Sequence, residues 1–219
     1  MRGAVGMGRV YEATWGRAFA AIYERALRAT EEAGLRRMRR ELLAGARGRV
    51  LELGAGTGLN LDLYPSAVER LTAVEPDPHM AARLRPKLAA LGREVEVVEA
   101  PGERLPFAAA SFDTAVVTLV LCTVPDPAAT LSELARVLAP GGRLLFIEHV
   151  RAEDPGLARW QDRLERPWRF LGDGCHCNRD TLATIAASPL RLGTVEHDRL
   201  PKALPIVEPL VRGDATHAA

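Results

Sequence analysis

The sequence predicts an α/β fold, a doubly wound, mostly parallel, Rossmann-like sheet of about seven strands with helices on both faces and helices before the first strand. Two observations predict it. Short, continuously apolar runs, typical of strands buried on both faces, alternate with helical segments between residues 46 and 150. Such alternation builds βαβ units and a parallel sheet. Ligands of these sheets bind beyond the carboxyl ends of the strands, so the loops at those ends matter most. These loops follow residues 54, 75, 100, 120 and 148.

The elements follow one another in a regular order. Residues 11–44 place apolar side chains three and four residues apart, which predicts two amphipathic helices with a break near Gly34. Strands are then predicted at 49–54, 70–75, 94–100, 112–120 and 143–150. Helices are predicted between them at 60–63, 80–91 and 126–139. The last helix begins at Asp126, a residue type that caps helix N-termini, with Pro127 at its first position.

After residue 150 the pattern changes. A helical stretch containing tryptophan and arginine covers 154–171, and two weak strands are predicted at 191–198 and 205–212. We expect a single domain over 1–219 with three parts. Lid helices occupy 1–45, the ligand-binding core occupies 46–150, and the segment with the closing strands occupies 151–219.

The amino-acid composition indicates which cellular compartment and which kinds of partner to expect. The 29 Lys and Arg residues against 28 Asp and Glu residues leave a net charge of +1, so no overall field would recruit nucleic acid or an anionic membrane. The basic cluster LRRMRR at 35–40 is interpreted as the solvated face of a helix. Three cysteines are too few for a disulfide framework, which suits a reducing compartment. No apolar stretch reaches 18 residues and no signal peptide is recognisable. We therefore expect a cytoplasmic protein with no integral membrane segment and no nucleic-acid partner.

The stretch VLELGAGTGLN at 50–60 places a glycine-dense loop directly after the first strand. A dinucleotide-binding loop of the G-x-G-x-x-G type would need a third glycine at the position of Leu59. Instead, the glycines stand at alternate positions, Gly54, Gly56 and Gly58, and Glu52 precedes them in the strand. Glycines this dense let the backbone approach a ligand closely. A tight turn with no ligand is the alternative.

The second strand ends at Glu75, 21 residues after Gly54. An acid at this place can accept hydrogen bonds from both ribose hydroxyls of an adenosine, as in NAD-dependent enzymes. Glu75 could instead be the N-terminal acid of the next helix. Together with the loop, it predicts a cofactor that carries adenosine.

With two later motifs, the loop makes residues 45–150 resemble the class I S-adenosylmethionine (SAM)-dependent methyltransferases. These motifs are VEPDPHM and FDTAVVTLVLCTVPDPAATLSELARVLAPGGRLLFIEHV. The resemblance implies SAM as cofactor and S-adenosylhomocysteine as product, and the absence of Lys and Arg from 50–60 agrees with a sulfonium in place of a pyrophosphate. It implies that the cofactor is bound by Glu52, Gly54, Ala55, Gly56, Thr57 and Asn60 around the methionine part, Glu75 at the ribose, Pro76 and Met80 at the adenine, Thr118 and Leu119 after the fourth strand, and Tyr11 with Trp15 in a lid.

One motif departs from the family pattern. Many relatives carry Gly-Asp-Ala-Glu before LPF, whereas this chain has APGERLPF with Pro101 at the aspartate position. We therefore expect the adenine amine to be read by the backbone around Gly102 and by Glu103. Glu103 could instead be a solvated loop acid.

Methyl transfer is an in-line displacement, so the enzyme mainly positions a nucleophile and removes its proton. The candidate catalytic residues are His149, Cys122, His176 and Arg179. A histidine bonded to backbone and a small buried cysteine are the structural alternatives for the first two. The CHCN segment at 175–178 lacks C-x-x-C spacing and a second pair, so no metal site is predicted.

A narrower resemblance, to the small-molecule thiol S-methyltransferases of the methyltransferase-like group, extends the similarity to 48–212. It is carried by TLVLCTV, SELARVLAPGG, IEHV and WQDRLERPWRFLGDGCHCNRDT. It implies a small, fairly apolar methyl acceptor, a thiol first, and an acceptor pocket of Trp160, Trp168 and Phe170. Quinone C-methyltransferases and phospholipid N-methyltransferases share parts of these motifs and stay open, as do a NAD-dependent oxidoreductase and a SAM-binding protein without turnover. The residues predict no oligomeric state.

Overall fold

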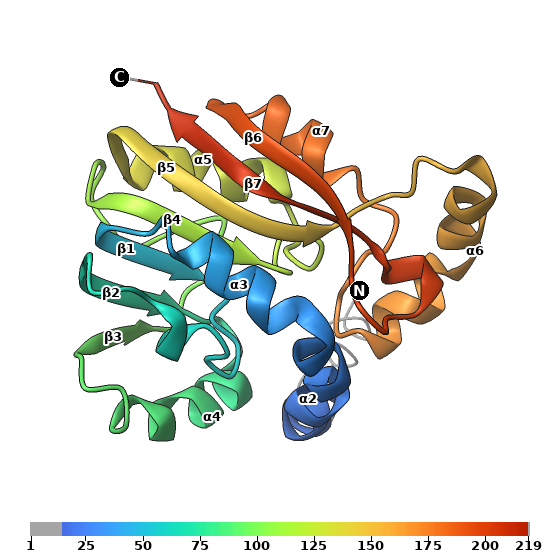
Figure 1. Cartoon of the computed structure of the whole chain (residues 1–219), viewed down its shortest axis with the longest axis horizontal. Coiled ribbons are helices and arrows are strands. Elements are labelled where there is room, and N and C mark those ends of the chain that lie inside the picture. The colour runs from blue at the N-terminus through green and yellow to red at the C-terminus, as the bar shows by residue number, and fades with distance from the viewer. Residues whose placement is uncertain (1–14, 219) are drawn as a thin grey trace, which may run out of the picture.

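The computed structural model describes residues 15–218, and a seven-stranded sheet runs through its centre (Figure 1). The strands are β1 (Gly48–Leu53), β2 (Val68–Val74), β3 (Val95–Val98), β4 (Phe112–Thr118), β5 (Leu138–His149), β6 (Leu190–Arg199) and β7 (Pro209–His217). Their order is β3-β2-β1-β4-β5-β7-β6, and only β7 runs antiparallel to its neighbours. The prediction of a mostly parallel, doubly wound sheet is confirmed.

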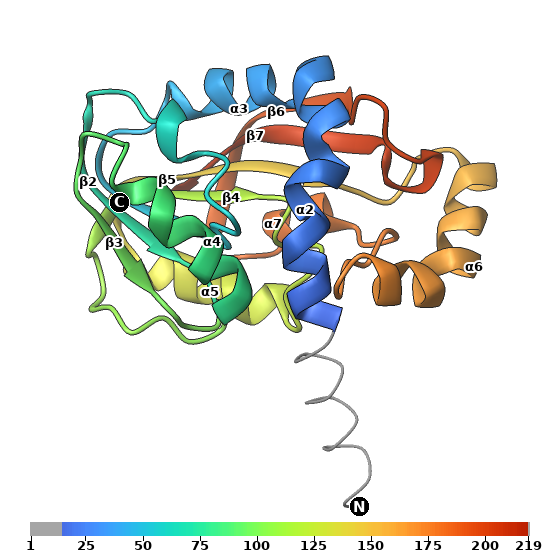
Figure 2. The same ribbon diagram turned by 90° about the horizontal axis from the view of Figure 1, so that it is seen from below.

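Helices cover both faces of the sheet because successive side chains of a buried strand point to opposite sides. In β1, Val50 belongs to one apolar core and Leu51 to the other. The first core includes residues of α3 (Arg36–Leu43) and α4 (Pro78–Leu88), and the second includes residues of α5 (Pro127–Val137) and α7 (Thr181–Ala186). Figure 2 shows α3 on one side of the strands, and α5 and α7 on the other.

The predicted pair of N-terminal helices is present. The first, α2 (Arg17–Thr30), passes through a π-helical turn, Glu31–Leu35, into α3. Gly34 in this turn has a φ of 152°, a backbone conformation that side-chain-bearing residues rarely adopt, so the predicted break falls where only glycine fits. As a result, α2 runs across the strands whereas α3 runs along them (Figure 2).

Three helices begin with aspartate followed by proline. Asp77, Asp126 and Asp154 cap α4, α5 and α6 (Pro155–Leu171), each accepting a hydrogen bond from a backbone N–H of the first turn. The carboxylate satisfies one of the N–H groups that a helix start leaves unpaired. Proline fits the next position because its missing N–H has no partner there. The predicted cap at Asp126 is thus confirmed.

Three predictions about local structure are wrong. The predicted helix at 60–63 is a single 3₁₀ turn, Leu61–Leu63. The last strand begins at Pro209 and not at 205, because Pro205, which cannot donate a ladder hydrogen bond, opens a 3₁₀ turn. The cluster at 35–40 is not simply a solvated face, since Arg39 is only 3% exposed.

Two further expectations concern the ends of the chain and the membrane. The lid residue Tyr11 lies outside the described residues. Within residues 15–218, no helix has both the length and the apolar character needed to cross a membrane.

Candidate active site

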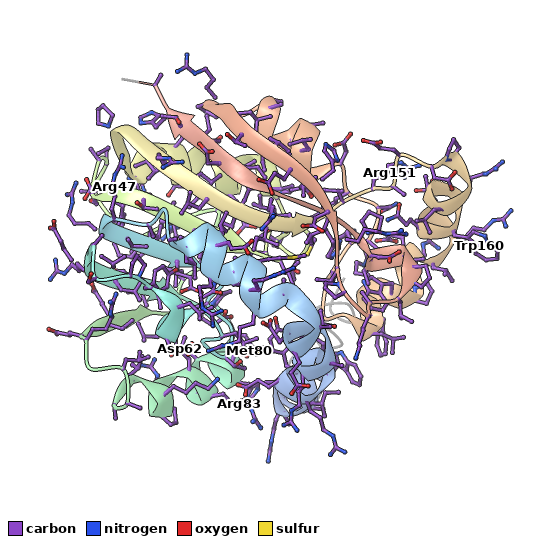
Figure 3. All side chains as sticks on the ribbon, in the orientation of Figure 1. Arg47, Asp62, Met80, Arg83, Arg151 and Trp160 are labelled. Atoms are coloured by element: carbon purple, nitrogen blue, oxygen red, sulfur yellow. The ribbon has the colours of Figure 1, made fainter. Side chains whose placement is uncertain are left out.

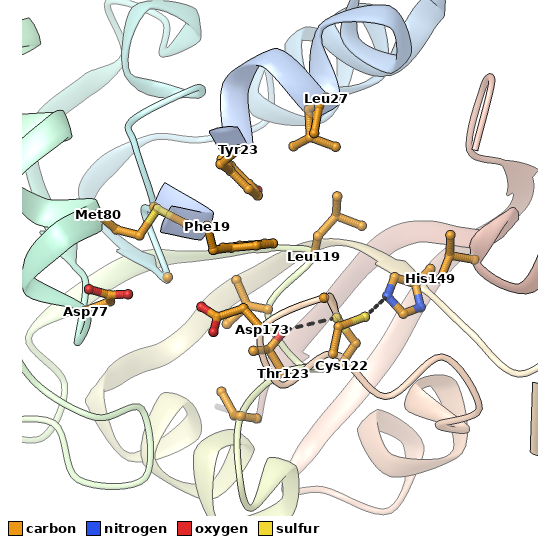
Figure 4. A pocket seen from close by; sticks show the side chains of 18 of the residues that line it. Phe19, Tyr23, Leu27, Asp77, Met80, Leu119, Cys122, Thr123, His149 and Asp173 are labelled. Carbon is orange, nitrogen blue, oxygen red and sulfur yellow. Dashed lines mark hydrogen bonds between the residues drawn. The ribbon is translucent and has the colours of Figure 1, made fainter. Parts of the chain in front are cut away.

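A cavity of about 840 Å³ lies at the carboxyl ends of the strands. Its wall comes from the glycine loop after β1, the end of β2, the loop after β4, the segment after α6 and the inner side of α2. In Figure 4, Asp77 and Met80 lie at one end of the cavity and Cys122 and His149 at the other, with Phe19 and Tyr23 of α2 along one side. The expectation that ligands bind beyond the strand ends is therefore matched by a cavity at that place.

The glycine loop combines close packing with open space. Gly54, Gly56 and Gly58 have φ values of 65°, 56° and 80°, all in the left-handed region that favours glycine. A Cβ atom on Gly54 would lie 2.5 Å from Cγ2 of Val120, and one on Gly58 would lie 2.7 Å from Cδ1 of Leu61. A Cβ atom on Gly56 would meet only the carbonyl oxygen of Gly54, at 4.0 Å. Gly54 and Gly58 thus serve packing, whereas Gly56 leaves room at the cavity wall.

Glu75 faces the cavity from the end of β2. Its carboxylate accepts hydrogen bonds from the backbone N–H groups of Gly56, at 2.7 Å, and Asp77, at 2.9 Å. Burial raises the pKa of Glu75 to about 7, these two N–H groups lower it, and the carboxylates of Asp77 and Asp173 add to the rise. A carboxylate has about four acceptor positions, so two are left for hydroxyl donors of a ligand.

Glu52 lies behind the loop in a buried hydrogen-bond network. Its Oε1 accepts from Nδ2 of Asn60 and its Oε2 from the hydroxyl of Tyr64, both at 2.9 Å. Asn60 also donates to Oγ1 of Thr118, at 3.0 Å. Burial raises the pKa of Glu52 to about 7, which the hydrogen bonds from Tyr64 and Asn60 oppose. Glu52, Asn60 and Thr118, with Ala55 and Thr57, line a small cavity of about 20 Å³ that shares Gly54 and Gly56 with the large one.

Arg39 is a site residue that the sequence did not predict. Its Nη1 donates to Oδ1 of Asn60, at 3.0 Å, and to Oγ1 of Thr118, at 2.8 Å, while its Nε donates to Glu31, at 3.0 Å. A guanidinium buried this deeply is kept only when its donors are paired. The available signal was its spacing, because Arg39 follows Leu35 by four residues and therefore lies on the same buried side of the helix.

The end of the cavity near Met80 is built from the predicted adenine residues. Pro76, Met80, Gly102 and Glu103 all line it, and the Met80 side chain points inward from α4 (Figure 4). Oε1 of Glu103 accepts from the backbone N–H of Asp126, at 3.1 Å. Glu103 thus also ties its own loop to the start of α5.

A cluster of two thiols and an imidazole forms the opposite end. Cys122 lies in the turn after β4, His149 ends β5, and Cys175 follows α6. Nε2 of His149 is 2.9 Å from Sγ of Cys175, and Nε1 of Trp168 donates to the same sulfur, at 3.2 Å. All three cluster residues are buried and line the cavity.

The cluster and its neighbour Glu148 have strongly perturbed electrostatics. A hydrogen bond with Cys175 and the charge of His149 place the pKa of Cys122 well below its usual value, and the same hydrogen bond, with burial, raises that of Cys175. Burial is the largest single influence on the pKa of His149 and lowers it, but the charge of Cys122, a hydrogen bond with Cys122 and the charge of Glu148 together raise the pKa above its ordinary value. Burial raises the pKa of Glu148 to about 8, and its Oε1 accepts from the N–H groups of Val120 and Leu121. Glu148 thereby fixes the turn that carries Cys122.

Several other predicted acceptor residues lie outside the cavity wall. Nδ1 of His176 is 2.8 Å from Glu165, and Nη1 of Arg179 donates to the carbonyls of Leu121 and Val124. Trp160 is 54% exposed on the outer side of α6 (Figure 3). Phe170 stacks on Trp15, with ring centroids 5.7 Å apart.

The predicted acceptor pocket of three aromatic residues is therefore wrong in part. Only Trp168 of the three lines the cavity, along with Leu119 and Trp15.

Comparisons with known proteins agree with this geometry. Residues 51–146 match the family model described as a methyltransferase domain. Human thiol S-methyltransferase TMT1B is 44% identical over 147 residues, and human thiol S-methyltransferase TMT1A is 35% identical over 179 residues. The two matches cover 64% and 78% of this chain, and 59% and 72% of the relatives.

Two further comparisons concern other members of the fold. A phosphatidylethanolamine N-methyltransferase of Cereibacter sphaeroides is 36% identical over 139 residues, which are 62% of this chain and 68% of that protein. The solved N-methyltransferase NodS of Bradyrhizobium japonicum, in complex with S-adenosylhomocysteine, superposes with a TM-score of 0.63 at 18% identity, covering 84% of this chain and 87% of that one.

Proposed function

Because the chain belongs to the class I SAM-dependent methyltransferases, we propose that it transfers the methyl group of SAM to the sulfur of a small, fairly apolar thiol. The cluster of Cys122, His149 and Cys175 in the wall of the cavity carries this proposal. Two thiol S-methyltransferases among the relatives support it, and the chain spans 59% and 72% of their lengths.

The proposed cofactor position follows from the polar groups of the cavity. Glu75 would accept hydrogen bonds from the ribose hydroxyls, since it lines the cavity beside Gly56 and its carboxylate can accept more hydrogen bonds than the two from the backbone. Pro76 and Met80 would lie against the adenine. The methionine part would lie over Gly54 and Gly56, with the loop held in place from behind by Glu52 and Asn60.

The acceptor would enter at the other end. Leu119, Trp168 and Leu204 give this part of the cavity an apolar wall, which suits a small apolar molecule better than a charged one. When bound, SAM supplies an electrophilic methyl group, whose bond to the sulfonium breaks as the bond to the acceptor sulfur forms, with the electron pair staying on S-adenosylhomocysteine. The residues of the chain hold the acceptor in line and accept or release its proton.

Three predicted catalytic residues would act at this end in different ways. Among the described histidines, His149 is the one that lines the cavity, and it would act at the acceptor directly. Arg179 and His176 do not reach the cavity and would act as positioning residues. Arg179 holds the carbonyls of Leu121 and Val124, and the backbone N–H of His176 donates to the carbonyl of Cys122, at 2.8 Å.

Cofactor binding and acceptor choice can be tested separately. Isothermal titration calorimetry should detect SAM and S-adenosylhomocysteine, and Glu75→Ala should weaken binding by about 1.5 to 3 kcal/mol through loss of two hydrogen bonds. Glu153→Ala, whose side chain is 89% exposed, is the matched control and should bind as the wild type does. An unchanged dissociation constant for Glu75→Ala would place the ribose elsewhere.

A panel of thiols, phenols, amines and quinones with labelled SAM then tests the acceptor. We expect aliphatic and aromatic thiols to be methylated and the other classes to be poor acceptors. Transfer to a phospholipid amine but not to thiols would favour N-methylation, the activity named for the Cereibacter sphaeroides relative.

A further inference from the structure

Three soft metal ligands converge at the acceptor end of the cavity. Sγ of Cys122, Sγ of Cys175 and a ring nitrogen of His149 all lie within 4.8 Å of one another. Among the described residues, this is the one group of three such side chains close enough to hold a metal ion. In a tetrahedral zinc site, with Zn–S near 2.3 Å and Zn–N near 2.0 Å, ligand atoms are about 3.5 to 3.8 Å apart. The cluster needs adjustments of only about 1 Å to reach that geometry.

We propose that Cys122, His149 and Cys175 bind a zinc ion whose fourth ligand is the sulfur of the methyl acceptor. The fourth ligand rests on the proposed thiol S-methylation, whereas the three protein ligands do not. The site was not visible in the sequence, because its ligands lie 27 and 26 residues apart and only one comes from the CHC segment.

The number and placement of the ligands favour a catalytic site over a structural one. Structural zinc sites have four protein ligands, while catalytic sites have three and keep one position for water or substrate. All three ligands of this cluster line the cavity, so the open position faces the space where an acceptor would lie. Two thiolates also neutralise the charge of Zn²⁺, which a buried site requires.

The surroundings fix the ligands before any metal arrives. His149 is the last residue of β5, paired with Leu210 of β7. The turn that carries Cys122 is held by Glu148 through two backbone N–H groups. Nε1 of Trp168 donates to Sγ of Cys175, and such hydrogen bonds from the surroundings orient ligands and tune their donor strength.

Zinc would also explain how the acceptor thiol loses its proton before methyl transfer. A thiol that coordinates zinc is deprotonated, and its proton passes to solvent water. The coordinated thiolate then forms the new S–C bond while the C–S bond of the sulfonium breaks, and its electron pair remains on S-adenosylhomocysteine. The thioether product carries no charge and is a weaker ligand, so it can leave. In this arrangement His149 is a ligand and not the base.

The chain contains its own control. Cys177 is fully buried, two residues from Cys175, but its thiol donates to the carbonyl of Gln161, at 3.5 Å, and it lies outside the cluster. Cys177→Ser therefore matches Cys175→Ser in chemistry and burial while leaving the three proposed ligands in place.

Zinc binding is measured first, without substrate. The wild-type protein is stripped with a chelator, kept reduced with a phosphine and dialysed against Zn²⁺, and bound metal is quantified by mass spectrometry. We expect one zinc per chain for wild type and Cys177→Ser. Loss of affinity on the order of 100-fold or more is expected for Cys122→Ser and Cys175→Ser, since even residues that only support ligands contribute 10- to 100-fold. Failure of the wild type to bind one equivalent would overturn the proposal, and this result does not depend on how the variants fold.

Cobalt provides a spectroscopic reading of the fourth ligand. Co²⁺ in the wild-type protein should show sulfur-to-cobalt charge-transfer bands that weaken in Cys122→Ser. Adding a thiol acceptor should strengthen these bands, whereas the methylated thioether should not. A spectrum that does not respond to thiol would overturn the fourth ligand.

Activity separates this proposal from the proposed function. If zinc-free protein methylates thiols as fast as zinc-loaded protein, the assignment of the acceptor sulfur as fourth zinc ligand fails and thiol methylation stands. If zinc binds to the three ligands but no thiol is methylated, the metal site stands and the proposed function fails.

Discussion

Replacing Gly54 by alanine tests the packing of the glycine loop against the turn after β4. Alanine at this position would keep a φ of 65°, which costs about 1 to 2 kcal/mol for a residue with a side chain. Its Cβ would also lie 2.5 Å from Cγ2 and 2.9 Å from Cγ1 of Val120, and overpacking of this kind costs about 1 to 3 kcal/mol. We therefore expect Gly54→Ala to lower the free energy of unfolding by about 2 to 5 kcal/mol.

The comparison variant is Gly56→Ala, with a φ of 56° and no neighbour nearer than 4.0 Å to the new Cβ. It carries the backbone term alone, about 1 to 2 kcal/mol, but its methyl group points into the space proposed for SAM. The two variants should thus differ in opposite ways. Without ligand, Gly54→Ala should have the lower free energy of unfolding. Gly56→Ala should be more stable than Gly54→Ala but should lose more SAM affinity relative to the stability that it loses.

Urea unfolding followed by circular dichroism, without SAM, gives the free energies, and a double-mutant cycle with Val120→Ala isolates the clash. Removing the Val120 methyl groups should restore about 1 to 3 kcal/mol to Gly54→Ala as a favourable coupling energy. The reasoning is refuted if the coupling is below about 0.5 kcal/mol, or if both glycine variants lose the same stability.

Three further predictions concern buried charge and helix capping. Burial raises the pKa of Glu75 to about 7, so the stabilising contribution of the protonated carboxyl is present at pH 4 and is lost as the pH rises through 7. Glu75→Gln should remove up to about 3 kcal/mol of this pH dependence of the unfolding free energy. Unfolding measured between about pH 4.5 and 8.5 tests this. Arg39→Met breaks buried hydrogen bonds and should lower the unfolding free energy by about 3 kcal/mol, whereas the exposed Arg40→Met should change it by less than about 0.5 kcal/mol; equal effects would contradict the assigned network. Asp126→Ala removes the N-cap of α5 and should lower the melting temperature through a loss of about 1 kcal/mol, and an unchanged melting temperature would show that the cap contributes nothing.

Local patterns were sufficient to predict the sheet and the residues that line the proposed cofactor end of the cavity. Continuous apolar runs, the alternate glycines and the acid ending β2 are all short-range signals, and parallel strands bring their carboxyl ends to one edge whatever lies between them. Each described residue predicted to bind cofactor lines the large or the small cavity. Whether each one contacts SAM stays a prediction.

The acceptor end could not be predicted in the same way, because its residues meet only through tertiary packing. Cys175 reaches Cys122 and His149 after α6 folds back toward the strand ends, and no periodicity encodes that path. The burial of Arg39 could not be predicted, because a run of four arginines in six residues is typical of a solvent-exposed helix face. Arg39 is the one of the four that points inward. Its hydrogen-bond partners are Glu31 in the preceding helical turn, and Asn60 and Thr118, which lie far along the chain.

The cavity is assembled from two parts of the chain, one inside and one outside the range matched by the family model. The glycine loop, Glu75 and Met80 lie inside residues 51–146, the range that matches the family model of a methyltransferase domain. Most of the opposite wall lies outside it, in α2, in His149 and in the segment from Trp168 to Val207. Exchange of these flanking segments should change the range of acceptors while leaving the proposed cofactor end unchanged. Chimeras joined near residues 50 and 148 would be the natural unit for redirecting such an enzyme.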